Sequence, residues 1–151
     1  MSTDRPVSPT GLEQLQQAFF GGGYARGIGR TLAFSAVEVE AGRVVFEGRP
    51  TQDHYNPIGT VHGGYAATLL DSALGCAVHS TLPAGVGYTT VDLNVTYVRA
   101  LTESSGPVRC EGKILHAGGR IATAEAKLWD KDGRLCATGV TTCLILRPDR
   151  K

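Results

Sequence analysis

The fold of this chain is decided by the stretch Asn56-Pro57-Ile58-Gly59-Thr60-Val61-His62-Gly63-Gly64, which runs directly into Tyr65–Leu82. A polar, turn-rich loop thus opens a long segment that is apolar on most sides, and such a segment predicts a buried helix. Its polar and small residues follow the spacing i, i+3, i+4, i+7, i+11 and form one stripe: Thr68, Asp71, Ser72, Gly75 and His79. A buried carboxylate is costly unless it is paired or has a chemical role, so Asp71 is the first candidate for a functional group.

Length and charge limit what the protein can be. With 151 residues the chain suits one domain with a substantial core, and 15 basic against 14 acidic residues give a net charge of +1. This balance argues against nucleic acid or an anionic membrane surface as the main partner. Residues 1–10 lack the apolar core of a secretory signal, and no run reaches the roughly 18 apolar residues of a membrane span, so we expect a cytoplasmic protein.

The four cysteines are expected to be reduced core residues. Cys76, Cys110, Cys136 and Cys143 lie inside expected helices or strands and show no CxxC spacing. Since no pair of Cys or His residues has the spacing of zinc ligands, we expect no metal site.

The segment before the buried helix predicts one short helix and two strands. Residues 1–9 are expected to be flexible. Thr10 and Glu13 have the spacing of a capping box, which predicts an outer helix that continues to Phe20 and ends at Gly21-Gly22-Gly23. The elements that follow are a loop at Gly27–Arg30, strands at Thr31–Glu40 and Arg43–Arg49 with a bulge near Ala36, and an irregular loop at Thr51–Val61.

After the helix, which Pro83-Ala84-Gly85 is expected to stop, the pattern changes to the period of two that is typical of strands. A row of small residues on one expected strand leaves room for a helix to approach closely. The row is Ala122, Ala124 and Ala126, and the expected strands are Tyr88–Arg99, Val108–Ile114, Ala122–Leu128 and Leu135–Leu146.

The order of elements predicts an α+β fold. Short turns imply antiparallel pairing, so we expect one curved antiparallel sheet wrapped around the helix, in a single domain of residues 10–147 with a charged tail at 148–151. The Tyr88–Arg99 strand is long, and an exposed long edge is a liability unless it pairs. Pairing with a second copy through a two-fold axis is the simplest remedy.

Three features near the helix start are typical of acyl-transfer chemistry. Gly63 and Gly64 would present N–H groups at the positive end of the helix dipole, where an oxyanion is stabilised. Asp71 would act as general base or nucleophile. Asn56 and His62 flank the loop and would hydrogen-bond a substrate carbonyl or a water molecule.

Each of these residues also has a structural interpretation. Gly63-Gly64 would serve as a tight junction between loop and helix, His62 as a helix N-cap, and Asn56 as a turn residue. Thr68 and Ser72 would bond back to helix carbonyls.

The arginines leave two further alternatives open. Asp71 would form a buried ion pair with Arg99 or Arg120. Arg99, Gly118, Gly119 and Arg120 would either hold a phosphorylated cofactor or be solvated turn residues.

The pattern Asn56-x2-Gly59-x2-His62-Gly63-Gly64, followed by Asp71-Ser72, resembles the hotdog-fold acyl-CoA thioesterases of the phenylacetate-pathway (PaaI) type. The resemblance covers roughly Leu32 to Leu146. It implies the hotdog order of elements, in which a curved sheet wraps one long helix, together with an oligomer: a dimer, often paired into a homotetramer, that binds coenzyme A across its interface.

The resemblance also implies a role for each catalytic candidate. The Gly63 N–H would polarise the thioester carbonyl, while Asp71, facing a loop of the partner subunit, would activate water or attack the carbonyl. Asn56 would orient the water or the carbonyl, and His62 would steady the loop. The candidate substrate-binding residues are Gly64, Thr68, Ser72, Arg99, Gly119 and Arg120.

The sequence therefore predicts a cytoplasmic hydrolase that converts an aryl (phenylacetyl- or benzoyl-type) or medium-chain acyl-CoA to the free acid and coenzyme A. We expect no cofactor, because coenzyme A is part of the substrate. One alternative is a hotdog dehydratase or hydratase acting on 3-hydroxyacyl thioesters, although the Pro-flanked motif expected near the helix start is absent. The other is a non-catalytic acyl-CoA-binding protein, for whose output domain 151 residues leave no space.

Overall fold

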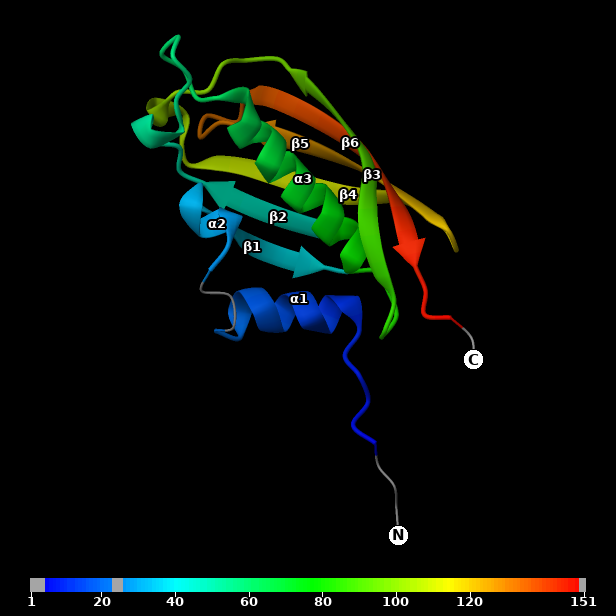
Figure 1. The fold of residues 1–151 in the computed structure, drawn as a ribbon. Coiled ribbons are helices and arrows are strands. Elements are labelled where there is room, and N and C mark those ends of the chain that lie inside the picture. Colours follow the sequence, from blue (N-terminus) through cyan, green and yellow to red (C-terminus); the bar gives the residue numbers. More distant parts are fainter. Residues whose placement is uncertain (1–4, 23–25, 150–151) are drawn as a thin grey trace.

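The computed structural model describes residues 5–22 and 26–149, in which one antiparallel sheet wraps around a long helix (Figure 1). The sheet has six strands in the order β1-β2-β4-β5-β6-β3. The strands are β1 (Phe34–Glu40), β2 (Arg43–Gly48), β3 (Gly87–Tyr97), β4 (Val108–Ala117), β5 (Ile121–Trp129) and β6 (Leu135–Leu146). The helices are α1 (Gly11–Phe20), α2 (Ile28–Thr31) and α3 (Gly63–His79), with 3-10 turns at Gln52–His54 and Glu103–Ser105. The expected α+β architecture is confirmed.

Helix α3 lies in the hollow of the sheet and supplies the centre of the core (Figure 1). Its fully buried side chains are Leu69, Leu70, Ala73, Leu74, Ala77 and Val78. None of the helices among the described residues has the length and apolar character needed to cross a membrane. Burial of α3 on nearly all sides explains why its sequence is apolar nearly all round.

The end of α3 differs from the expectation. The helix stops at His79, so the prediction that it continues to Leu82 is wrong. Beyond that point the backbone hydrogen bonds span three residues instead of four, since Leu82 N donates to the His79 carbonyl. The Ser80 hydroxyl also donates to the Ala77 carbonyl at 2.7 Å, so a side chain competes for the carbonyls of the last turn.

At one position the backbone of the helix comes very close to the backbone of the sheet. A Cβ atom added at Gly112 on β4 would collide with the backbone carbonyl of Ala73 on α3. The predicted row of small residues on β5 lies beside this contact, and Ala122, Ala124 and Ala126 are at most 2% exposed. Small residues on the two neighbouring strands β4 and β5 therefore let α3 pack closely against the sheet.

The N-terminal helix begins and ends as predicted. Thr10 N donates to the Glu13 carboxylate at 2.8 Å, and Glu13 N donates to the Thr10 hydroxyl, which is the expected capping box. The helix ends at Phe20, and α1 lies alongside β1 (Figure 1). Residues 1–4 of the expected flexible N-terminus, Gly23 of the glycine run, and residues 150–151 of the expected tail lie outside the described residues.

Two expectations about the following segment are wrong. Gly27–Arg30 is not a loop, because Ile28–Thr31 forms the single-turn helix α2, which is too short to carry a periodic pattern. The first strand begins at Phe34 rather than Thr31, since Ala33 has a φ of 54° and turns the chain out of extended geometry. The predicted bulge is confirmed as a register shift between Ala36 and Glu38.

Strand β3 forms one edge of the sheet and is exposed, as expected. β3 pairs with β6 and borders no other strand in the sheet order. Along and just after this edge Val91, Tyr97 and Val98 are 63%, 54% and 58% exposed. A long sheet edge that exposes apolar side chains is typical of a surface that pairs with another chain.

We predict that Gly112→Ala destabilises the protein by about 1–3 kcal/mol, because the added methyl group meets helix backbone that cannot move aside as a side chain would. Gly119→Ala is the matched control, since a Cβ there meets nothing within 4 Å. Both variants are compared with wild type by urea unfolding. Equal midpoints for Gly112→Ala and wild type would show that the helix does not depend on this contact.

Candidate active site

The start of α3 is capped by the side chain of the residue before it. His62 Nδ1 accepts a hydrogen bond from Gly64 N at 2.8 Å, and the His62 carbonyl accepts one from Tyr65 N at 2.9 Å. Within the described residues, Gly63 N has no acceptor. The structural interpretation of His62 as an N-cap is therefore correct, and the Gly63 N–H is the donor left open at the positive end of the helix dipole.

Asn56 holds the preceding loop in shape. Its Oδ1 accepts hydrogen bonds from Ile58 N at 3.1 Å and Thr60 N at 3.2 Å. Its Nδ2 donates to the Thr60 hydroxyl at 3.0 Å. These bonds, with Gly59 at a φ of 89°, make a compact turn, so the structure supports the turn interpretation of Asn56 within one chain.

A second side chain, which the sequence did not single out, lies against the helix start. The Tyr97 hydroxyl on β3 donates to the Gly63 carbonyl at 2.6 Å. Tyr97 also lines a cavity of about 300 Å³ together with His62, Gly63 and Arg99. One of the predicted arginines, Arg99, thus lines the same cavity as Gly63.

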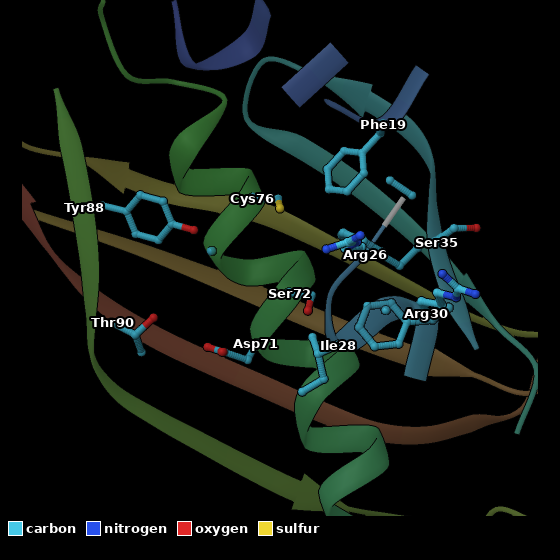
Figure 2. Close-up of a pocket in the computed structure, with 15 residues that line it drawn as sticks. Phe19, Arg26, Ile28, Arg30, Ser35, Asp71, Ser72, Cys76, Tyr88 and Thr90 are labelled. Atoms are coloured by element: carbon cyan, nitrogen blue, oxygen red, sulfur yellow. The ribbon is translucent and has the colours of Figure 1, made fainter. Parts of the chain in front are cut away.

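Asp71 lines a different and larger cavity, of about 450 Å³ (Figure 2). Ser72 shares this cavity on α3, and Tyr88 and Thr90 face it from β3. Burial raises the pKa of Asp71, while a hydrogen bond with the Thr90 hydroxyl acts in the opposite direction. No ion pair joins Asp71 to an arginine within residues 5–22 and 26–149, so the alternative of an ion pair with Arg99 or Arg120 is not supported.

The opposite wall of this cavity is aromatic and carries cations. Phe46 packs edge-on against Phe19 and Phe34, with ring centroids 5.6 and 5.7 Å apart. Figure 2 shows Arg26 and Arg30 on the side of the cavity away from Asp71 and Thr90. The cavity therefore has an acid at one end and an apolar aromatic lining with positive charge at the other.

The cysteines are all free thiols, and Cys110, Cys136 and Cys143 are buried as expected. Cys76 is only partly buried and lines the cavity beside Asp71. Burial, together with the charge of Asp71, raises its pKa to about 12, so it is a neutral thiol and a poor nucleophile. Among the described residues, no group of three or more His, Cys, Asp or Glu side chains is placed to hold a metal ion.

Four of the six predicted substrate-binding residues line neither cavity; these are Gly64, Thr68, Gly119 and Arg120. The Thr68 hydroxyl bonds back to the Gly64 carbonyl at 2.7 Å, as its structural interpretation predicts. Gly119 and Arg120 form the β4–β5 hairpin, next to the residues of β6 that pair with the start of β3. Gly63 contacts the other end of β3, so one chain alone does not bring this hairpin to the helix start.

The carboxylate and the open N–H are also apart within one chain. Gly63 and Asp71 are separated by eight residues on α3, which is about 12 Å along the axis. They face different cavities. A single carbonyl group cannot be reached by both from the same helix.

Similarity to known proteins identifies the family. The model of the thioesterase superfamily matches residues 58–137, just over half of the chain. Human acyl-coenzyme A thioesterase 13 is 32% identical over 117 residues, covering 76% of this chain and 82% of that protein. The 1,4-dihydroxy-2-naphthoyl-CoA hydrolase of Escherichia coli K12 is 31% identical over 90 residues, covering 60% and 65%.

A solved structure agrees with these relatives. The phenylacetic acid degradation-related protein of Ralstonia eutropha JMP134 has a TM-score of 0.76 at 26% identity, covering 86% of this chain and 98% of that one. The resemblance to the PaaI type is thereby confirmed. The chain belongs to the thioesterase superfamily and is a thioester hydrolase with the hotdog fold.

Proposed function

We propose that this protein hydrolyses acyl-CoA thioesters, with Asp71 as general base or nucleophile and the Gly63 N–H as the donor to the carbonyl oxygen. The observation that carries the proposal is the environment of Asp71. It is a partly buried carboxylate without an ion-pair partner among the described residues, at the end of an aromatic-lined cavity. Such a group is costly in a purely structural role.

The chemistry follows from these two groups. The carbonyl oxygen of the thioester accepts a hydrogen bond from the Gly63 N–H, which stabilises the negative charge that develops there. Asp71 takes a proton from a water molecule as the water attacks the carbonyl carbon. The tetrahedral intermediate collapses, the C–S bond breaks, and the thiolate of coenzyme A takes up the proton. In the nucleophilic variant Asp71 forms an acyl anhydride, which water then hydrolyses.

The site is proposed to be shared between two copies of the chain. Because about 12 Å of helix separates Gly63 from Asp71, each carboxylate would act with Gly63 of the partner subunit. The exposed apolar edge of β3 supports pairing between copies, and a two-fold axis would generate two equivalent sites. Arg99, which lines the same cavity as Gly63, would contact the phosphates of coenzyme A.

The acyl group is proposed to be aryl or of medium chain length. A cavity of about 450 Å³ with three phenylalanines in its lining suits a compact apolar group. The names of two similar proteins, the naphthoyl-CoA hydrolase and the phenylacetic acid degradation-related protein, support an aryl group. The four free cysteines are typical of the reducing cytoplasm, where we propose that the protein acts.

We predict that Asp71→Asn lowers the rate of thiol release from benzoyl-, phenylacetyl- and octanoyl-CoA by at least ~10²-fold. The fold should remain intact. Because burial raises the pKa of Asp71, its charge at neutral pH costs stability, so the variant's Tm should equal or exceed that of wild type. Asp132→Asn removes the same charge from an exposed turn and serves as control. A near-normal rate for Asp71→Asn would exclude it as base or nucleophile.

We predict that Gly63→Pro also abolishes hydrolysis. Proline is tolerated at the first position of a helix, and it removes the N–H group that we assign to the carbonyl oxygen. Co-expression of Gly63→Pro with Asp71→Asn should restore about a quarter of wild-type activity, since about half of randomly paired dimers are mixed and each holds one intact site. If the site lies within one chain, mixing restores nothing.

The pH dependence follows from the environment of Asp71. Asp71 must be ionised to accept a proton, so kcat/KM falls as the pH drops through its pKa, and burial places that fall above pH 3.8. Thr90→Val removes the hydroxyl that lowers the pKa and should move the acid limb to higher pH. Thr89→Val, on the other face of β3, is the control. An acid limb that Thr90→Val leaves in place would contradict the assignment of this limb to Asp71.

A further inference from the structure

The hydroxyl of Tyr88 lies in the larger cavity and has no role in the mechanism proposed above. Tyr88 lies on β3 two residues before Thr90, so both side chains leave the strand on the same face. Its ring rests against the imidazole of His79, with centroids 5.5 Å apart. Figure 2 shows the hydroxyl directed from β3 toward α3, into the cavity that Asp71 also lines.

This hydroxyl has no hydrogen-bond partner within the part of the chain that the structure describes. Two other tyrosines do have partners: the Tyr97 hydroxyl donates to the Gly63 carbonyl, and the Tyr55 hydroxyl accepts from Glu103 N at 2.9 Å. A partly buried phenol usually finds a partner. The Tyr88 hydroxyl instead faces the space that we assign to the acyl group.

The helix leaves room for this hydroxyl. A Cβ atom added at Gly75 would lie 2.8 Å from the Tyr88 oxygen, so only glycine permits the present approach. Gly75 follows Asp71 by four residues, about one turn of α3. Measured along the helix axis, the hydroxyl therefore lies roughly 6 Å from the carboxylate that we propose acts on the thioester.

The hydroxyl is a proton donor at neutral pH. Burial, together with the nearby charge of Asp71, raises the pKa of Tyr88 above its ordinary value. Two guanidinium groups, those of Arg26 and Arg30, line the same cavity. The Tyr88 hydroxyl and these two guanidinium groups are hydrogen-bond donors. They therefore favour a ligand that carries an acceptor oxygen.

We propose that Tyr88 is a specificity-determining residue, whose hydroxyl donates a hydrogen bond to an oxygen carried by the acyl group about one helical turn from the thioester carbonyl. The preferred substrates are then acyl-CoAs with a hydroxyl or other acceptor oxygen on a compact apolar body, such as a hydroxylated ring. This proposal rests on the proposed function. An acyl group without that oxygen leaves the phenol unpartnered and is hydrolysed less efficiently.

The test compares kcat/KM for benzoyl-CoA and its 2-, 3- and 4-hydroxy derivatives in wild type, Tyr88→Phe and Tyr97→Phe. Wild type should prefer at least one hydroxylated isomer by about threefold to tenfold, the effect of one neutral hydrogen bond. Tyr88→Phe keeps the ring, and its ratio of kcat/KM between the hydroxylated isomer and benzoyl-CoA should fall to about one. Tyr97→Phe removes a hydroxyl from the same strand outside this cavity and should change all four rates by one common factor.

Equal wild-type efficiency with all four thioesters, or a preference that survives in Tyr88→Phe, would overturn the role of Tyr88 and leave the hydrolase assignment in place. The proposed function fails in a different way, when wild type releases no thiol from any aryl or straight-chain acyl-CoA. Gly75→Ala provides an independent variant, because its methyl group displaces the hydroxyl without removing it, and it should weaken the same preference.

Discussion

The structure depends on close packing between the backbone of α3 and the sheet that surrounds it. At Gly112 no side chain separates β4 from the Ala73 carbonyl, and the alanines of β5 extend this close contact. A helix held so near the sheet is buried on almost every side. Most of the residues of α3 can therefore be apolar without exposing an apolar patch to water. The same burial fixes the few polar groups of α3 in position relative to β3.

The partly buried carboxylate of Asp71 lowers the free energy of unfolding, and interactions elsewhere in the fold must offset this loss. The carboxylate of Asp71 loses part of its hydration, and within the described residues only the Thr90 hydroxyl is known to offset that loss. Strong packing elsewhere on α3 supplies the stability that permits such a group. This cost agrees with the role that we propose for Asp71, since active sites commonly retain a locally unfavourable charge for its reactivity.

Much of the fold could be predicted from sequence because its signals are local. The Thr10–Glu13 capping box, the bulge after Ala36 and the apolar character of α3 each depend on residues close together in the chain. Tyr88 and Thr90 were not identified as site residues, since alternation along β3 tells which residues share a face but not which helix position they meet. Arg120 illustrates the same gap: only the register of β5, β6 and β3 shows that its hairpin lies at the end of the sheet away from Gly63.

The cap at the start of α3 also determines what His62 can do. Because its Nδ1 accepts the Gly64 N–H, the neutral ring must carry its proton on Nε2. His62 therefore presents a donor, and no basic nitrogen, to the surroundings of the helix start. The hydrogen bond that caps α3 thus limits the neutral imidazole to binding an acceptor atom, which agrees with the role of base that we propose for Asp71.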